Sequence, residues 1–393
     1  MNRRRIFLLA AFCLSSAFLS SCGVPPKQVP IFDTVASGKL QWIGEMPVLK
    51  LSGSPYQMGY QHGTLLRREV RASVKNIMAF ADQQLKVPGL GRPVARRKLD
   101  QAWKQMKPHV PERYLEEMQG LADGAGIPLR TLQRVHALPD LTSVACASSA
   151  VAGPATQDGR LIQIRNLDWA IQSNVQRYAA LIIYEPAGRK PFVSVGWLGF
   201  IGVLSGISRS GISVAQIGAE TQDTNLRGVP MPFLLRRVLE EADNLKQAVQ
   251  IVEAGPRTVG YNYLVADAKA RSAVALETTR QHSAVFWMDP ESRLVRSDYP
   301  LDPVVRGLQT EKSPEKTKAY QVRYRGQAQL LQKFYGQINP EIAMAIAAAI
   351  APSSNIQSVV YAYPQIWVAS AYRHRPAARG AYLQIDLEEL FLT

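Results

Sequence analysis

One cysteine and two charged residues carry the strongest signal for chemistry in this chain. Cys146 lies near the start of the run SVACASSAVAG, and Arg165 and Asp168 lie in RLIQIRNLDW, which follows a D-G turn at 158–159. The two runs predict an antiparallel hairpin that returns both charged residues to the side of the cysteine. A guanidinium near a thiol favours the thiolate, and a carboxylate there could hold a protonatable amine. The same two charges would also suit a structural ion pair at a strand end.

The cysteine count bears on the same residue. The chain has three cysteines: Cys13, Cys22 and Cys146. Cys13 lies in a segment typical of secretion signals and Cys22 follows that segment, so an exported chain would keep one thiol without a disulfide partner. Such a thiol is either buried and inert or a nucleophile. The count alone leaves both interpretations open.

A papain-like pairing of cysteine with histidine is the main enzymatic alternative. The local C-G-[SA]-C-[WY] context of that class is absent. The histidines have no metal-ligand spacing and fit surface or hydrogen-bonded positions. They are His62, His109, His136, His282 and His374. We find no phosphate loop, G-x-S-x-G or HExxH motif, so the sequence predicts neither a metal nor a cofactor.

The stretch from Cys146 through RNLDW resembles the acyl-coenzyme A:6-aminopenicillanic acid acyltransferase family. These are N-terminal-nucleophile hydrolases, related to penicillin V acylase and bile salt hydrolase, with a cysteine, a strand, a D-G turn and R-N-x-D-W in order. The motifs SPYQMGYQHG (54–63), GWLGFIGVLSGISRSGISV (196–214), YNYLVADA with LETT (261–279), IWVASAY and GAYLQIDL agree with the family. The resemblance covers most of residues 48–388.

The resemblance implies a four-layer αββα fold and a precursor that cleaves itself between Ala145 and Cys146. The freed α-amino group of Cys146, with a reference pKa of about 7.7–8.0, would then act as the general base. Arg165 would support the sulfur and Asp168 would orient the α-amine. Asn262 would donate a side-chain N–H to the oxyanion.

Two positions depart from the family pattern. Ala147 follows the nucleophile where family members often have Thr or Ser, and Ser208 stands where many have Asn. A second side-chain contact to the oxyanion, from Ser208, is therefore left open. Neither departure changes Cys146, Arg165 or Asp168.

The implied product of cleavage is an α-chain of residues 22–145 and a β-chain of residues 146–393. The implied activity is attack by Cys146 on a linear amide or acyl thioester of a small-molecule substrate. A thioester intermediate would pass the acyl group to water or to an amine. Two alternatives stay open: specificity like that of choloylglycine hydrolase or penicillin V acylase, and a non-catalytic envelope lipoprotein that retains the fold. The sequence does not indicate an oligomeric state.

The order of elements predicts an α+β protein. Helical patterns cover about 54–85, 95–107, 111–125 and 128–137, so we expect a helical segment over 41–145 ahead of a core over 146–393. From about residue 143 short runs of Val, Ile and aromatic residues alternate with turns. Further helices are expected at 231–254 and 314–350, with strands between and after them. This order suits antiparallel strands covered by helices in a layered sandwich.

The N-terminus predicts export. Arg3–Arg5 precede an apolar stretch over residues 6–18, and Leu19–Cys22 resemble a bacterial lipobox. We expect a signal peptide over 1–21, lipid on Cys22 and a tether over 22–40. The lipid would anchor the protein in the cell envelope, at the outer membrane facing the periplasm if the organism is Gram-negative. A plain signal peptide with an incidental Cys22 is the alternative.

Composition narrows the remaining classes. The chain has 393 residues, 47% of them hydrophobic, and a net charge of +15. After the N-terminus no apolar run is long enough to predict a multi-span membrane protein. The basic run Arg92–Lys107 could contact anionic lipid or substrate, or form a solvated helix face. No basic motif with interleaved aromatic residues predicts nucleic-acid binding.

Overall fold

The computed structural model describes residues 33–35, 38–85, 91–142, 145–289, 291–372 and 374–392. The predicted signal peptide (1–21), the lipid-attachment residue Cys22 and most of the predicted tether lie outside these residues. No helix in the described part of the chain is both long enough and apolar enough to cross a membrane.

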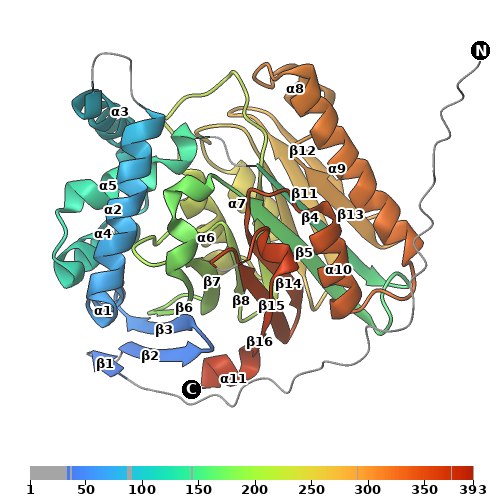
Figure 1. Cartoon of the computed structure of the whole chain (residues 1–393), viewed down its shortest axis with the longest axis horizontal. Coiled ribbons are helices and arrows are strands. Elements are labelled where there is room, and N and C mark those ends of the chain that lie inside the picture. Colours follow the sequence, from blue (N-terminus) through green and yellow to red (C-terminus); the bar gives the residue numbers. More distant parts are fainter. Residues whose placement is uncertain are drawn as a thin grey trace, which may run out of the picture.

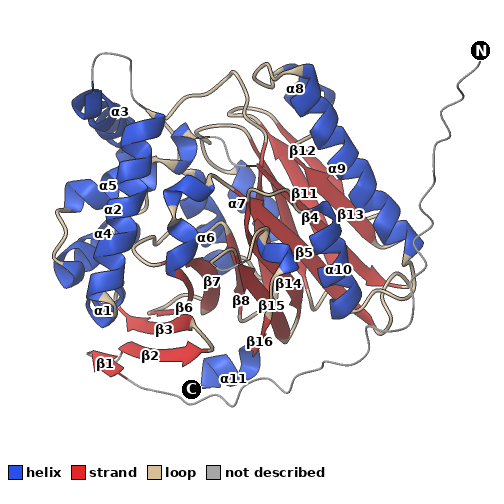
Figure 2. Cartoon of the chain, in the orientation of Figure 1, coloured by secondary structure: helices blue, strands red, loops and turns tan. Residues whose placement is uncertain are grey.

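Two β-sheets form the centre of the molecule (Figures 1 and 2). The larger sheet has the strand order β1-β2-β3-β6-β7-β8-β9-β10-β11-β12. Its strands are β1 (Asp33–Val35), β2 (Gly38–Ile43), β3 (Met46–Gly53), β6 (Ala179–Pro186), β7 (Phe192–Trp197), β8 (Ser205–Ser208), β9 (Ile212–Gly218), β10 (Tyr261–Asp267), β11 (Ser272–Thr278) and β12 (Ser283–Trp287). All neighbours are antiparallel except β3 and β6, which pair in parallel.

The smaller sheet has the order β13-β4-β5-β14-β15-β16. Its strands are β4 (Ala145–Gly153), β5 (Gly159–Asp168), β13 (Arg293–Ser297), β14 (Asn355–Ala362), β15 (Gln365–Ser370) and β16 (Leu383–Asp386). Strands β4 and β5 form the predicted hairpin. Their residues are buried on both faces, because this sheet is covered by the larger sheet on one side and by helices on the other.

Helices cover the outer face of each sheet. Helices α6 (Met231–Glu241) and α7 (Leu245–Glu253) contact β8 to β11, whereas α9 (Pro314–Lys333) and α10 (Pro340–Ile350) contact β13, β5 and β14. Apolar side chains such as Leu181, Val193 and Val359 pack between the two sheets. The predicted α+β class and four-layer αββα sandwich are confirmed.

The predicted N-terminal helices form a further group on the left of Figure 1. They are α1 (Pro55–Leu65), α2 (Arg67–Gln84), α3 (Gly91–Met106), α4 (Glu112–Ala125) and α5 (Leu129–Ala137). Helices α1 and α4 approach so closely that a Cβ atom added at Gly59 would lie 1.9 Å from the backbone oxygen of Glu117. Glycine at this position therefore permits the contact. The shorter helices α8 (Pro303–Gly307) and α11 (Leu387–Leu392) complete the set.

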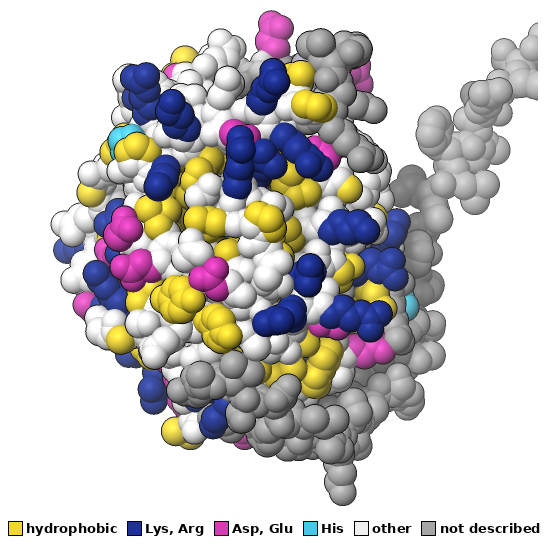
Figure 3. Space-filling view, turned by 90° about the vertical axis from the view of Figure 1, so that its left-hand side faces the viewer, with side chains coloured by type: hydrophobic (Ala, Val, Ile, Leu, Met, Phe, Trp, Pro, Cys, Tyr) yellow, Lys and Arg dark blue, Asp and Glu magenta, His cyan; other side chains and the backbone are white. Residues whose placement is uncertain are grey.

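The basic run lies on α3, whose apolar face packs on α2 and α5 through buried residues such as Leu99 and Trp103. Its other face carries exposed Arg and Lys side chains, including Arg97 and Lys98. Figure 3 shows this side of the molecule, with Lys and Arg side chains spread among apolar ones.

Three features differ from the sequence-based expectation. Strands β2 and β3 occupy residues 38–53, where we expected the end of a tether and the start of a helical segment. Residues 46–49 of β3 are buried on both faces, so no alternation of apolar and polar residues marks the strand. The predicted helices 54–85, 231–254 and 314–350 are each two helices. Asn339 caps the second helix of the last pair before Pro340.

Candidate active site

The β4–β5 hairpin sets the positions of the cysteine and the arginine. Cys146 pairs with Leu167, and Ser148 pairs with Arg165. Residues opposite each other in an antiparallel pair point to the same face, and so do residues two apart on one strand. The side chains of Cys146 and Arg165 therefore share the face that points into the space between the two sheets.

Asp168 lies on the opposite face of the same hairpin, because it pairs with Ala145. On that outer face it contacts the Arg323 guanidinium of α9 and accepts a hydrogen bond from Asn355 at 3.1 Å. The hairpin was predicted to bring Arg165 and Asp168 back beside Cys146, and the register pairs them with Ser148 and Ala145, on either side of it in β4. The side chains of Arg165 and Asp168, however, lie on different faces of the sheet.

Arg165 is fully buried, and its guanidinium is only partly paired. Its Nε donates to Ser205 Oγ at 3.1 Å and its Nη1 to the Asn166 carbonyl at 3.0 Å, while Nη2 has no hydrogen-bond partner among the described residues. A buried cation with an unpaired N–H group attracts a developing anion strongly. The residue is therefore available to stabilise a thiolate on the same face.

The thiol of Cys146 is buried and neutral in the uncleaved chain. Burial raises its pKa to about 11, against the opposing effect of Arg165, and the charges of Asp298 and Asp168 raise it further. Its Sγ contacts Gln216 Oε1 of β9 at 3.6 Å. The Nε2 atom of the same amide is buried with no partner among the described residues, so this side chain could also turn its N–H group toward a thiolate.

Asp298 contacts the backbone nitrogen of Cys146. The Cys146 backbone N–H donates to its two oxygens at 2.9 and 3.1 Å. Burial raises the pKa of Asp298 to about 7, opposed by Arg323 and increased by Asp168. This carboxyl group is therefore poised near neutrality against the nitrogen atom that cleavage would convert into an α-amine.

Arg323 joins the two carboxylates. It contacts Asp168 directly and lies 3.9 Å from Asp298. Its position on α9 places one cation between two buried acids, which lowers the cost of burying both charges. Sequence reasoning missed Arg323, Asp298 and Gln216, because each lies far from the hairpin in the chain.

The structure places Asn262 on β10, beside Ser297 of β13. Its Nδ2 donates to the Ser297 carbonyl at 3.2 Å, and its Oδ1 is buried without a partner among the described residues. Its amide is thus in use within the uncleaved chain. Ser208 lies at the β8–β9 turn, where its hydroxyl accepts from the Ile212 N–H at 3.1 Å. Arg165 contacts the other end of β8, at Ser205.

A narrow apolar pocket lies beside the thiol, under the N-terminal helices. Its walls come from α2, α5, β5, β7 and the loop after β7. They are Ile77, Val135, Leu138, Pro139, Leu167, Trp169, Val175, Trp197, Phe200 and Leu204. Leu167 pairs with Cys146, and Tyr261, whose hydroxyl donates to the Pro139 carbonyl, interacts electrostatically with the thiol. The pocket volume is about 40 Å³, so a hydrocarbon chain longer than a few carbon atoms would require its walls to move apart.

A second pocket, of mixed polar and apolar lining, opens to solvent beside Ala145, and we call it the mouth pocket. It is lined by Ala145, Asp168, Trp169, Ala170, Ile171, Gln172, Glu220, Lys316, Tyr320, Ser353 and Ser354. Trp169 lines both pockets, and its ring packs edge-on against Phe80 with centroids 5.1 Å apart. Trp169 is therefore shared by the walls of the apolar pocket and the mouth pocket.

The histidines lie away from the thiol's hydrogen bonds. His62 and His136 are buried, and each accepts a backbone N–H bond, from Gly199 and Ile201 respectively, at 3.0 Å. His282 contacts Asp302. Within the described residues, no cluster of three or more His, Cys, Asp or Glu side chains is arranged to hold a metal ion.

Comparison with known families gives one family match. The model of the acyl-coenzyme A:6-aminopenicillanic acid acyl-transferase family matches residues 155–296. The matched stretch contains Arg165, Asp168 and Asn262 and lies between Cys146 and Asp298. It covers less than half of the chain.

Individual proteins are similar over part of this chain. Protein dcd1B of Dictyostelium discoideum is 30% identical over 283 residues, which are 65% of this chain and 56% of that protein. The match thus spans little more than half of that relative. The N-acylethanolamine-hydrolyzing acid amidase of Rattus norvegicus is 21% identical over 192 residues, 46% of this chain and 51% of the amidase.

Among solved structures, the Caenorhabditis elegans ortholog of the N-acylethanolamine-hydrolyzing acid amidase is similar with a TM-score of 0.42 and 16% identity. The likeness covers 55% of this chain and 92% of that one.

Proposed function

We propose that this protein is a cysteine amide hydrolase or acyltransferase that activates itself by cutting the Ala145–Cys146 bond. One observation carries the proposal: the scissile nitrogen lies 2.9 Å from a buried carboxylate, and the thiol of the same residue shares a face with a buried arginine. The family match and the similarity to an amidase point to the same chemistry.

The self-cleavage step follows from these contacts. The Cys146 sulfur attacks the Ala145 carbonyl carbon as the thiol proton passes to water, and the C–N bond breaks as the nitrogen gains a proton. Asp298, in contact with that nitrogen and half protonated near neutral pH, delivers the proton. Water then hydrolyses the thioester, which leaves a carboxylate on Ala145 and a free thiol and α-amine on Cys146.

The processed residue then acts on a substrate. Its α-amine takes the thiol proton, and Arg165 stabilises the thiolate that attacks the acyl carbon. Asp298 accepts a hydrogen bond from the α-ammonium, and Arg323 with Asp168 keeps this carboxylate in place. Asn262, freed from Ser297 by a small rotation, is our proposed donor to the oxyanion.

The two pockets assign the two halves of the substrate. The apolar pocket beside Leu167 takes the acyl chain, because its walls offer only apolar side chains. The mouth pocket takes the amine half, which leaves toward solvent. A bound N-acyl amide would therefore lie beside Trp169, with its acyl chain in the apolar pocket and its amine half in the mouth pocket. Its carbonyl carbon would lie at the Cys146 sulfur.

We also propose that the chain is exported and held in the cell envelope by lipid on Cys22. The support is the sequence of residues 1–22 alone. Mass spectrometry of the mature N-terminal peptide tests it, since an unmodified thiol at Cys22 would contradict the anchor.

The central experiment follows self-cleavage and turnover together. Purified wild-type protein should separate on a denaturing gel into two fragments, and N-terminal sequencing of the larger should begin at Cys146. Cys146→Ala should stay intact and fail to hydrolyse any N-acyl amide, while Cys146→Ser should cleave slowly. An intact wild-type chain that hydrolyses no amide would instead favour a binding protein that retains the fold.

A further inference from the structure

The segment that carries Asp298 is held by a buried carboxylate of the other sheet. Asp298 lies one residue beyond the last paired residues of β4 and β13, Ala147 and Ser297, so the pairing of these strands ends before it. Glu277 of β11 is fully buried, and its carboxylate reaches this segment from the larger sheet. One side chain therefore links the two sheets at the segment that contacts the scissile nitrogen.

Both oxygens of Glu277 are in use there. Its Oε2 accepts backbone N–H bonds from Leu301 and Asp302, each at 2.7 Å. Its Oε1 lies 2.8 Å from Nε of Arg296, which is also buried. Arg296 precedes Asp298 by two residues, and the two N–H donors follow it by three and four. The segment is therefore fixed on both sides of Asp298 by a single carboxylate.

The surroundings of Glu277 keep this carboxylate in place. The guanidinium of Arg296 lies 4.2 Å from the centroid of the Phe286 ring, an arrangement that stabilises the cation in the interior. Across the β10–β11 ladder Glu277 pairs with Asn262, the proposed oxyanion donor. The same part of the larger sheet therefore carries the oxyanion donor and the residue that holds the Asp298 segment.

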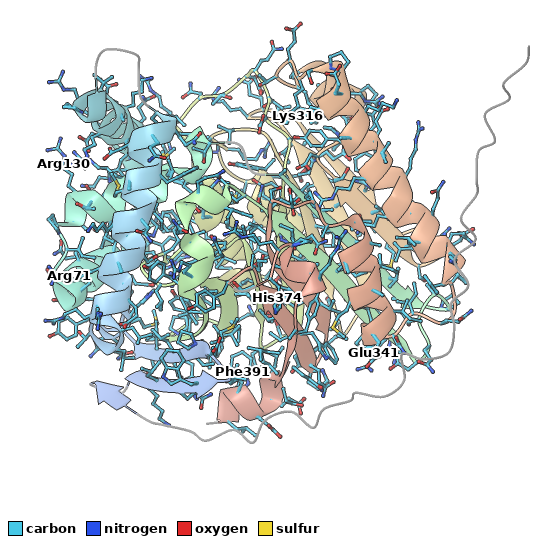
Figure 4. All side chains as sticks on the ribbon, in the orientation of Figure 1. Arg71, Arg130, Lys316, Glu341, His374 and Phe391 are labelled. Carbon is cyan, nitrogen blue, oxygen red and sulfur yellow. The ribbon has the colours of Figure 1, made fainter. Side chains whose placement is uncertain are left out.

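The electrostatics of Asp298 provide a readout of its position. Figure 4 shows Lys316 where α9 begins, and Arg323 lies about two turns further along this helix. Burial raises the pKa of Asp298 to about 7. The charges that also act on it belong to Arg323, Asp168 and Lys312. These charges stay in place when Glu277 is changed, so a shifted titration of Asp298 would indicate a displaced carboxylate.

We propose that Glu277 is a positioning residue for self-cleavage. By holding the segment on both sides of Asp298, it keeps that carboxylate within hydrogen-bond distance of the Cys146 nitrogen. It acts through Asp298 and not on the reacting atoms. This inference rests on the proposed function and adds a residue to its first step.

Glu277→Asp tests this role, because it keeps the charge and shortens the reach of the carboxylate. Self-cleavage of the variant should slow by about tenfold to a hundredfold, the cost expected of a misplaced catalytic group. The pH at which the rate falls to half should also decrease, since a displaced Asp298 gains water and its raised pKa falls. In an Asp298→Asn background the same substitution should change the rate less than about twofold. Gel time courses at several pH values measure all three effects.

Glu117→Asp is the matched control, because Glu117 is a fully buried carboxylate that pairs with Arg236 at 2.6 Å. It should lower the thermal stability and leave the pH profile of self-cleavage unchanged. Thermal unfolding checks that Glu277→Asp is folded. If it is not, Glu277→Gln, which keeps the side-chain length, enters the same comparison with and without Asp298→Asn.

The outcomes separate this inference from the proposed function. Equal slowing by the Glu277 variant with and without Asp298→Asn, at an unchanged pH profile, would overturn the positioning role and leave the proposed function intact. A wild-type chain that never separates into two fragments would overturn both.

Discussion

Both carboxylate oxygens of Asp298 accept from the backbone N–H of Cys146, at 2.9 and 3.1 Å, although the two residues are 152 positions apart in the sequence. In the proposed mechanism this nitrogen leaves the Ala145 carbonyl first and carries the catalytic proton afterwards. The same carboxyl group therefore serves self-cleavage as a proton donor and turnover as a hydrogen-bond acceptor.

Asp298→Asn should slow self-cleavage, because an amide cannot deliver the proton that the departing nitrogen needs. General-acid contributions of this kind are about a hundredfold or more. Burial raises the pKa of Asp298 to about 7, so its donor form is depleted above that pH. The ratio of wild-type to variant rates should therefore fall as pH rises through 7, as measured by gel time courses. Exposed Asp243→Asn serves as control, and wild-type kinetics in Asp298→Asn would refute the assignment.

Arg165→Gln should make the processed thiol less reactive at neutral pH. The guanidinium lowers the pKa of Cys146, so its removal shifts thiolate formation to higher pH. The pH dependence of iodoacetamide alkylation measures this shift, and thermal unfolding checks that the variant is folded. Arg165→Lys keeps the charge and should restore part of the reactivity. An unchanged alkylation profile in Arg165→Gln would exclude this role.

Val135→Phe should narrow the range of acyl chains. Val135 is buried on α5 and lines the apolar pocket, so a larger side chain there takes the space of hydrocarbon. We expect kcat/KM for long-chain amides to fall at least tenfold while short-chain amides change little. Val135→Ala enlarges the same pocket and should allow the hydrolysis of amides with bulkier acyl chains. A uniform loss on both chain lengths would indicate misfolding instead of a blocked pocket.

The two fragments should stay associated after cleavage. Arg236 of α6 contacts Glu117 of α4 at 2.6 Å and Glu240 at 2.8 Å, and all three are buried. Removing one partner of a buried ion network costs about 3–5 kcal/mol, so Arg236→Met should lower the urea midpoint of fragment separation strongly. Arg130→Met breaks an exposed pair with Asp100 and should cost less than about 1 kcal/mol. Equal urea midpoints for Arg236→Met and Arg130→Met would contradict the role of the buried Arg236 network in holding the two fragments together.

Acid should weaken the contact between the N-terminal helices and the core. Burial lowers the pKa of His62 to about 3 and of His136 to about 4, and each neutral ring accepts a backbone N–H bond. A group whose folded pKa is depressed contributes stability above its unfolded value of about 6.5, and that stability is lost as pH falls toward 4.

Thermal unfolding between pH 7 and 4 measures this loss. Buried Asp140, whose pKa burial raises to about 6, works in the opposite direction, so the variants must be compared with wild type at each pH. His136→Gln should show a shallower decline than wild type. An identical slope would show that His136 does not titrate in this range.

Local pattern predicted the hairpin that carries the nucleophile. The D-G turn and the two apolar runs fixed the β4–β5 pairing, and the period of two along a strand also places Arg165 and Leu167 on one face with Asp168 on the other. That last step was available from the sequence alone and explains why Asp168 contacts α9 instead of the thiol.

Non-local contacts could not be predicted in this way. Asp298 follows β13, a five-residue strand with no turn signal tying it to β4, and Arg323 lies on a helix whose docking depends on the whole sheet. Strands β2 and β3 were missed for a related reason, since burial on both faces removes the alternation that marks a strand. Side chains that meet through tertiary packing leave no periodic trace in the chain.

The parallel pairing of β3 with β6 has a consequence for the processed protein. Once the bond before Cys146 is broken, neighbouring strands of one sheet belong to separate polypeptides. Recovery from complete denaturation then becomes a bimolecular encounter that depends on dilution, whereas the unbroken precursor can fold as a single molecule. Cleavage would therefore follow folding of the precursor, and the cleaved protein would not regain its fold as readily after denaturation.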